Sequence, residues 1–273
     1  MTVKIAYILG CTHSGTTLLH RVLGAHSRIL NLGSVKNLRT AVREGKKCPC
    51  GAPKLEQCSF WQAIDEQVRA LDGRSVFDLD PDSRWARRFA TDNRVLFQAV
   101  AAAHGVQVVI DSSRRPSRLD RLRQVPGIDL VPIHLYKTPP AQVHSWEKRN
   151  RPRQITVSAL RYWGKHRYAR QVARHFPGAL RVSYEAFCQD PETETARIAR
   201  ALGLAPEPEA VRHWGENPIH VLGGNRMKSQ QDSVIRLDEK RRRELTAAEQ
   251  RRIDRVCGRV YRQLTAGQPE ATG

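Results

Sequence analysis

The strongest indication of the fold comes from the segment Val3-Lys4-Ile5-Ala6-Tyr7-Ile8-Leu9-Gly10-Cys11-Thr12-His13-Ser14-Gly15-Thr16-Thr17. Its first seven residues form an aliphatic run that predicts a buried β-strand, and an apolar helix start follows residue 17. Gly10 and Gly15 have the spacing of the nucleotide-binding loop G-x-x-x-x-G-K-[ST], with Thr17 in the last position. Amides at such a turn and the dipole of the next helix favour an anion. The sequence therefore predicts a phosphate-binding loop between strand and helix.

Position 16 departs from this pattern because it holds Thr16 instead of lysine. In ATP- and GTP-using enzymes that lysine reaches the β- and γ-phosphates. Its loss removes a charge-assisted hydrogen bond to a triphosphate, which argues against ordinary nucleotide hydrolysis. A donor with fewer charges at its reactive end still fits the loop.

Three further aliphatic runs predict strands, at residues 106–111, 130–136 and 180–184. Helical patterns separate them, which is the alternation expected of an open parallel sheet. Asp190-Pro191 predicts the start of one helix, and the capping box Thr246-Ala247-Ala248-Glu249 predicts the start of another. We expect an α/β fold with a P-loop NTPase-like open parallel sheet flanked by helices.

The segment from about residue 37 to residue 105 is too long for one crossover between strands. We interpret it as a helical insertion after the first βα unit, beside which an acceptor pocket can form. One helix within it has an apolar side formed by Phe60, Trp61, Ile64, Val68 and Leu71. The prediction is one domain over residues 1–265 with a flexible tail at 266–273.

Charge and hydropathy narrow the classes of protein to consider. Lys and Arg total 46 against 27 Asp and Glu, a net charge of +19 that attracts anions. Because the basic residues are scattered, a solvated surface and a specific polyanion partner are both compatible with this excess. No apolar run approaches the ~18 residues of a membrane span, and the N-terminus lacks a basic region and a cleavage site. We expect a cytoplasmic protein.

Three of the six cysteines cluster, at Cys48, Cys50 and Cys58. This spacing suits zinc, but structural zinc takes four ligands and no fourth stands at an obvious spacing. Reduced, partly buried thiols are the preferred interpretation, and zinc is the alternative. We expect no metal in the reaction itself.

Thr12-His13-Ser14-Gly15-Thr16-Thr17-Leu18-Leu19, followed by Leu23-Gly24-Ala25-His26, resembles the 5′-phosphosulfate loop of the sulfotransferase superfamily, commonly [KR]-S-G-T-T-L. The resemblance implies that the loop binds 3′-phosphoadenosine 5′-phosphosulfate (PAPS). Amides of Ser14 to Thr17 and the hydroxyls of Thr16 and Thr17 would hold its 5′-phosphate. His13 occupies the place of the usual Lys or Arg.

Later segments resemble the same superfamily, in its order along the chain. Lys137 and Ser145 match the segment that binds the 3′-phosphate, in place of an Arg and a Ser. Tyr184, in Val182-Ser183-Tyr184-Glu185, matches a tyrosine that packs on the adenine. The element His220-Val221-Leu222-Gly223-Gly224-Asn225-Arg226-Met227-Lys228 implies a loop near the nucleotide, with Asn225, Arg226 and Lys228 as its binding residues.

This chain departs from the family pattern at the position of the usual catalytic base. Many relatives have Gly-Glu after the first helix, but this chain has Gly33-Ser34 there. Asp111, in a segment similar to the D-S-S-K-type turn of many bacterial members, is either a site residue with Ser112 and Arg114 or a helix N-cap. The candidate catalytic residues are His13, Lys36 and Asp111, with His20 as a further replacement.

The sequence thus predicts a PAPS-dependent sulfotransferase that acts on a hydroxyl or amine. The acceptor is a small molecule, a carbohydrate, a lipid or a peptide tyrosine, and nucleic acid is not expected as a partner. The alternatives are a P-loop kinase or related phosphotransferase, and a non-catalytic polyanion-binding protein.

Overall fold

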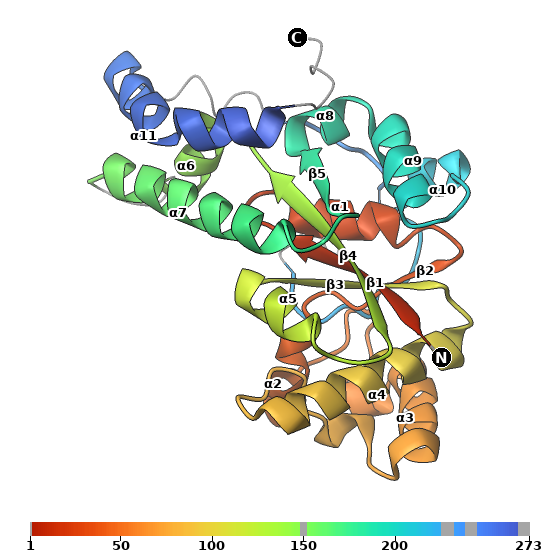
Figure 1. The fold of residues 1–273 in the computed structure, drawn as a ribbon. Coiled ribbons are helices and arrows are strands. Elements are labelled where there is room, and N and C mark those ends of the chain that lie inside the picture. Colours follow the sequence, from red (N-terminus) through yellow and green to blue (C-terminus); the bar gives the residue numbers. More distant parts are fainter. Residues whose placement is uncertain (1, 148–151, 225–231, 238–244, 267–273) are drawn as a thin grey trace.

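The computed structural model describes residues 2–147, 152–224, 232–237 and 245–266. Its centre is a five-stranded sheet in which each pair of neighbouring strands is parallel, in the order β2-β3-β1-β4-β5 (Figure 1). The strands are β1 (Val3–Leu9), β2 (Ile29–Asn31), β3 (Val108–Arg114), β4 (Ile128–Tyr136) and β5 (Leu180–Ser183). The predicted α/β class is confirmed. β2 was not predicted, and β3 begins two residues later and ends three residues later than the expected 106–111.

Both faces of the sheet are covered, which explains why β1 is an unbroken apolar run. Ile5 and Tyr7 belong to a core shared with the insertion helices, α5 (Pro116–Leu122) and the end of α7 (Ile155–Ala173). Ala6 and Ile8 point the other way, into a core with α1 (Thr16–Leu23) and other helices. Alternate residues of one strand therefore serve two cores.

The remaining helices follow β4 and β5. They are α6 (Pro139–Glu147), α8 (Tyr184–Gln189), α9 (Pro191–Ala201), α10 (Pro208–Arg212) and α11 (Ala247–Thr265). Two predicted starts are confirmed, since the Asp190 side chain accepts from the Thr193 amide and Thr246 with Glu249 forms a capping box. α7 and α11 pack together at one end of the molecule (Figure 1).

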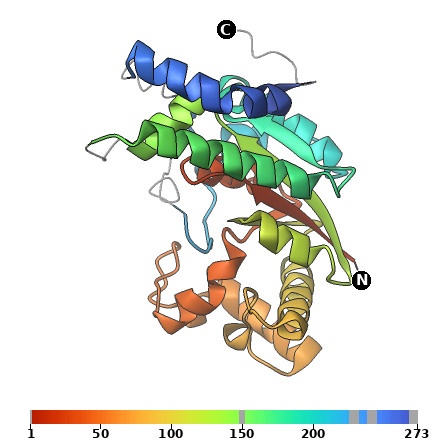
Figure 2. The same cartoon turned by 60° about the vertical axis from the view of Figure 1, so that its left-hand side comes forward.

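The predicted insertion is present between β2 and β3. It contains α2 (Leu38–Arg43), α3 (Ser59–Asp72) and α4 (Ala86–His104), which lie together at the end of the molecule opposite α7 and α11 (Figures 1 and 2). Trp61, Ile64 and Val68 of α3 are buried as expected. Leu71, which the spacing places on the same side, lies in the last turn of α3 and is 53% exposed.

Among the described residues, no helix has the length and hydropathy needed to cross a membrane.

Candidate active site

A cavity of about 210 Å³ lies where the phosphate loop meets the carboxyl ends of β2 and β3. In open α/β sheets this is where ligands bind. Its walls come from the loop, the start of α1, the turns after β2, the end of β3 and a glycine from the late segment. The lining residues are Thr12, His13, Gly15, Thr16, Thr17, His20, Ser34, Ser112, Arg114 and Gly224. The structure thus brings most of the predicted loop residues together with Ser112 and Arg114.

Gly15 sets the shape of the loop. Its φ of 91° lies in the left-handed region, and a Cβ there would stand 2.1 Å from Cδ2 of Tyr184. The Tyr184 ring therefore packs directly on the glycine. α1 begins at Thr16 without a side-chain cap, so its first amides keep the donors that a helix leaves without internal acceptors. These amides and the hydroxyls of Thr16 and Thr17 suit an anion in the cavity.

Helix α6 supports the loop through hydrogen bonds to the backbone of Thr12. The carbonyl of Thr12 accepts hydrogen bonds from Gln142 Nε2 (2.9 Å) and Trp146 Nε1 (2.8 Å). Ser14 is fully buried, and its hydroxyl donates to the carbonyl of Cys11 (2.8 Å). The role of Gln142 and Trp146 was not predicted, because only the fold brings α6 to the loop. Ser14 has a supporting place in the loop, and its side chain does not line the cavity.

His20 is a buried, neutral imidazole at the cavity wall. Burial and the charges of Arg114 and Arg21 lower its pKa to about 3. The amide of Gly33 donates to Asn31 Oδ1 (2.9 Å), so Asn31 Nδ2 faces His20 Nδ1 at 2.6 Å. Nδ1 then accepts this bond and the proton lies on Nε2. His20 therefore serves as a hydrogen-bond donor rather than a base.

Ser34 and Arg114 give the cavity its remaining polar character. Within the described residues, Ser34 Oγ is buried without a hydrogen-bond partner, as expected of a group that meets a ligand. Arg114 has a φ of 66°, a left-handed conformation that costs a non-glycine residue energy and is found at functional sites. Burial lowers the pKa of its guanidinium, which nevertheless remains charged.

Asp111 is placed away from the cavity wall. It is fully buried, with one oxygen accepting from the Ser113 amide (2.8 Å) and the other 3.1 Å from the Arg118 guanidinium. It is not a helix N-cap, since that position before α5 belongs to Arg115. Lys36 is half-buried near the same turn. Burial, followed by the charge of Arg115, lowers the pKa of its amine.

The predicted 3′-phosphate residues lie beside the loop, outside the cavity wall. Lys137 is only 5% exposed and its Nζ stands 4.2 Å from the centroid of the Tyr184 ring. Ser145 is half-buried on α6. Tyr184 thus contacts both Gly15 and Lys137. Asn225, Arg226 and Lys228 lie outside the described residues.

A larger cavity of about 470 Å³ is lined by residues of α7 and α11, among them Arg167, Arg170, Arg174 and Arg259. It shares no lining residue with the loop. We place the candidate site in the smaller cavity, because uncapped helix amides, a strained arginine and a hydroxyl without a partner in the described part of the chain converge there.

A family model described as "Sulfotransferase family" matches residues 6–208. No curated protein matches the sequence. Among solved structures, the sulfotransferase domain of the olefin synthase of Synechococcus PCC 7002 aligns with a TM-score of 0.58 at 18% identity, over 95% of each chain. The sulfotransferase domain from the curacin biosynthetic pathway gives 0.56 at 15% identity, over 96% of this chain and 98% of that one. Sulfotransferase STF9 of Mycobacterium avium aligns with a TM-score of 0.51 at 13% identity, over 96% of this chain and 77% of that one. These similarities show the fold.

Proposed function

The chain belongs to the sulfotransferase family, and from this premise we propose that it transfers a sulfuryl group from PAPS to a hydroxyl or amine of an acceptor. The observation that carries the proposal is the cavity at the phosphate loop. It combines uncapped helix amides with Arg114, and among the described residues that line it there is no Asp or Glu. Such a wall attracts a phosphosulfate and offers no carboxylate to a magnesium–triphosphate complex.

We assign two roles to the residues of the cavity wall: binding the 5′-phosphate and stabilising the leaving oxygen. The family resemblance implies that the amides of Ser14 to Thr17 and the hydroxyls of Thr16 and Thr17 hold the 5′-phosphate. We propose this role for the amides of Gly15 to Thr17 and for both hydroxyls, because the Ser14 amide already donates to the Cys11 carbonyl (3.3 Å). In an in-line displacement the bond between sulfur and the phosphate oxygen breaks while the acceptor's oxygen or nitrogen bonds to sulfur. Negative charge develops on the leaving oxygen, and fixed donors there lower the barrier. We assign this stabilisation to Arg114, with the Nε2–H of His20 as a further donor.

The acceptor's proton needs a base within reach. His20 is a poor candidate for this base, because its Nδ1 already accepts a hydrogen bond from Asn31. Asp111 is a poor candidate as well, because its carboxylate is held by Arg118 and Ser113. Two candidates remain, His13 at the cavity wall and Lys36, whose lowered pKa favours the neutral amine. We propose that one of these two accepts the proton.

Lys137, Ser145 and Tyr184 remain proposed ligands of the 3′-phosphate and adenine, together with Asn225, Arg226 and Lys228. Lys137 is only 5% exposed, so contact between this lysine and a phosphate requires neighbouring side chains to move. No metal is expected in the transfer step, since sulfate carries less charge than a terminal phosphate. Omission of Mg²⁺ should leave the rate unchanged.

Thermal unfolding with candidate ligands tests the proposal. A ligand at a hundred times its Kd stabilises the native state by about 2.7 kcal/mol, which raises Tm by roughly 5–10 °C in a chain of this size. We expect such a shift with 3′,5′-bisphosphoadenosine and a much smaller one with ATP, GTP or an oligonucleotide. Lys137→Ala and Ser145→Ala should reduce the shift, whereas Lys46→Ala, at an exposed ion pair with Glu44, should not.

An equal response to ATP, together with no effect of Lys137→Ala or Ser145→Ala, would contradict the nucleotide assignment. A response to ATP that depends on Mg²⁺ would favour a kinase, and a response to the oligonucleotide that falls steeply with salt would favour a polyanion-binding protein. Mass spectrometry of acceptor panels incubated with PAPS then identifies the acceptor by the added sulfuryl group.

A further inference from the structure

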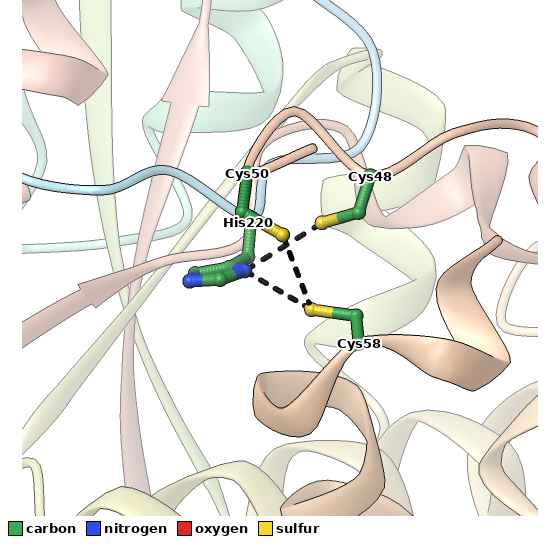
Figure 3. A group of neighbouring side chains, drawn as sticks. All are labelled: Cys48, Cys50, Cys58 and His220. Atoms are coloured by element: carbon green, nitrogen blue, oxygen red, sulfur yellow. Dashed lines mark hydrogen bonds between the residues drawn. The ribbon is translucent and has the colours of Figure 1, made fainter. Parts of the chain in front are cut away.

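Four side chains that the transfer reaction does not use meet at the edge of the insertion (Figure 3). Their ligand atoms, the sulfurs of Cys48, Cys50 and Cys58 and a ring nitrogen of His220, all lie within 4.8 Å of one another. His220 Nδ1 stands 3.2 Å from Cys58 Sγ and 3.5 Å from Cys48 Sγ, and Cys50 Sγ stands 3.6 Å from Cys58 Sγ. His220 is the fourth ligand that the cysteine spacing did not reveal.

These separations fit a tetrahedral ion. Zinc bonds of about 2.3 Å to sulfur and 2.0 Å to nitrogen place the ligand atoms of a tetrahedron about 3.5–3.8 Å apart. Three of the six separations, at 3.2–3.6 Å, are close to these edges, and all six lie within 4.8 Å. Figure 3 shows the three sulfurs and the ring nitrogen turned toward one common point. Three thiolates with one imidazole form a donor set typical of structural zinc.

The backbone around the cysteines prepares this arrangement. The Cys48 amide donates to the carbonyl of Ala52 (3.0 Å), and the Gly51 amide donates back to the carbonyl of Cys48 (3.0 Å). Gly51 has a φ of 105°, which closes the turn. Cys58 is the N-cap residue of α3, so its place is fixed by the start of that helix. Cys48 and Cys58 are each 2% exposed, so two ligands lie in the core of the insertion.

His220 is held in its orientation by aromatic packing. Its ring stacks on Phe60 at 4.3 Å between centroids and 4° between planes. The other face of Phe60 carries His104, stacked at 4.4 Å. Both histidines stack on Phe60, but only His220 belongs to the cluster with the three cysteine sulfurs. This difference supplies a matched control.

We propose that Cys48, Cys50, Cys58 and His220 bind one Zn²⁺ in a closed structural site. Binding exchanges three thiol protons, released to solvent, for three zinc–sulfur bonds, and no electron is transferred. Four protein ligands leave no position for water or substrate, so the ion stabilises structure and does not activate a nucleophile.

The zinc would join two distant parts of the chain. Cys48, Cys50 and Cys58 belong to the insertion, whereas His220 begins the segment in which Leu222 pairs with the turn after β2. The Ser34 amide donates to the Leu222 carbonyl (2.7 Å), and the Leu222 amide donates to the Leu32 carbonyl (2.8 Å). Two residues later, Gly224 reaches the wall of the candidate site. The ion therefore fixes the insertion against the late segment of the active-site wall.

Metal analysis of the full chain tests the proposal. We expect one zinc per chain after purification without chelator, and intense visible bands of tetrahedral, thiolate-bound cobalt after replacement with Co²⁺. Cys50→Ser, at the exposed ligand, keeps the buried part of the cluster and should weaken zinc binding at least tenfold, because even the loss of a second-shell partner costs about 10–100-fold. His220→Ala should do the same.

Cys188→Ser and His104→Ala are the controls, because Cys188 lies in the other core and His104 shares only the Phe60 stack. Both should keep full zinc content. A chain without zinc after growth in zinc-supplemented medium, or equal zinc in Cys50→Ser and Cys188→Ser, would overturn the proposal. So would a disulfide between Cys50 and Cys58 in the intact, metal-free protein. Metal content is measured without PAPS, so this result is independent of the proposed function.

Discussion

Arg114 combines a strained backbone with a place at the cavity wall. A left-handed conformation costs a residue with a Cβ roughly 1–2 kcal/mol, and glycine avoids this cost. The chain nevertheless has arginine there, next to the loop that would hold the donor. The simplest physical account is that the guanidinium is needed at this point and that the surrounding structure tolerates the strain.

Replacing Arg114 by Gly and by Ala separates its two properties. Both variants lose the guanidinium, and removal of one donor from a developing negative charge costs about 10²–10³ in kcat. We therefore expect both to lose about that factor in kcat with PAPS. The Gly variant should also be more stable than the Ala variant by about 1 kcal/mol in urea unfolding, because only Ala retains the strain. Equal stability of the two would show that the φ of 66° is not strained.

Some residues of the site were readable from the sequence, and others were not. Gly15, Thr16 and Thr17 were found because a phosphate loop is a local pattern with fixed spacing. The donor role of His20 was not found, because it depends on Asn31 and the Gly33 amide, which meet it only after β2 has paired. A hydrogen bond that selects a tautomer leaves no trace in residue spacing.

The element that supports the phosphate loop is α6. Trp146 and Gln142 both donate to the Thr12 carbonyl, so the loop has a fixed back wall as well as the helix that follows it. Preorganised amides cost no reordering when an anion binds. We therefore expect the affinity of the loop for an anion to depend on Gln142 and Trp146, two α6 side chains that do not line the cavity.

Trp146→Phe removes one of these donors and keeps most of the aromatic packing. We expect a loss of about 1 kcal/mol in the free energy of unfolding, the net value of one hydrogen bond. The Kd for 3′,5′-bisphosphoadenosine, measured by calorimetry, should rise by several-fold. Trp163→Phe, on the partly exposed side of α7, is the control and should change neither. Identical behaviour of the two variants would mean that α6 does not hold the loop.

Elements with strong local signals were predicted, and elements defined by distant partners were missed. β1 and the starts of α9 and α11 carry apolar runs and caps within a few residues. β2 has three residues, and its pairing with Val108 to Ile110 lies far along the chain. His220 was likewise overlooked as a ligand, because it stands 162 residues from Cys58. Sequence spacing can indicate metal ligands that lie on one loop. Ligands on two loops far apart in the sequence are recognised only once the fold brings them together.

At the scale of the whole molecule, buried neutral histidines tie stability to pH. Burial, aided by nearby arginines, lowers the pKa of both His20 and His134 to about 3. In the unfolded chain each would titrate near pH 6.5. Between these values the unfolded state binds more protons, so stability is fully present above pH 6.5 and is lost as pH falls toward 3. Further positive charge on a chain of +19 acts in the same direction.

Urea unfolding at pH 7, 6 and 5 measures this effect. Each such histidine should contribute about 1.4 kcal/mol per pH unit below its unfolded pKa. His134→Gln keeps a partner for His166 Nδ1 and removes one titrating group. The free energy of unfolding of this variant should therefore fall with decreasing pH less steeply than that of the original chain, by about 1.4 kcal/mol per pH unit. Parallel curves for the variant and the original chain would show that His134 protonates in the folded protein.

The pairing of Leu222 with the turn after β2 has a consequence for biosynthesis. The segment from β1 to β5 emerges from the ribosome well before residue 222, so the sheet has all of its strands while the wall that carries Gly224 is still missing. During synthesis all five strands are therefore available before the cavity wall is complete. A chain that stopped before residue 222 would carry every strand of the sheet but would lack the Gly224 part of that wall.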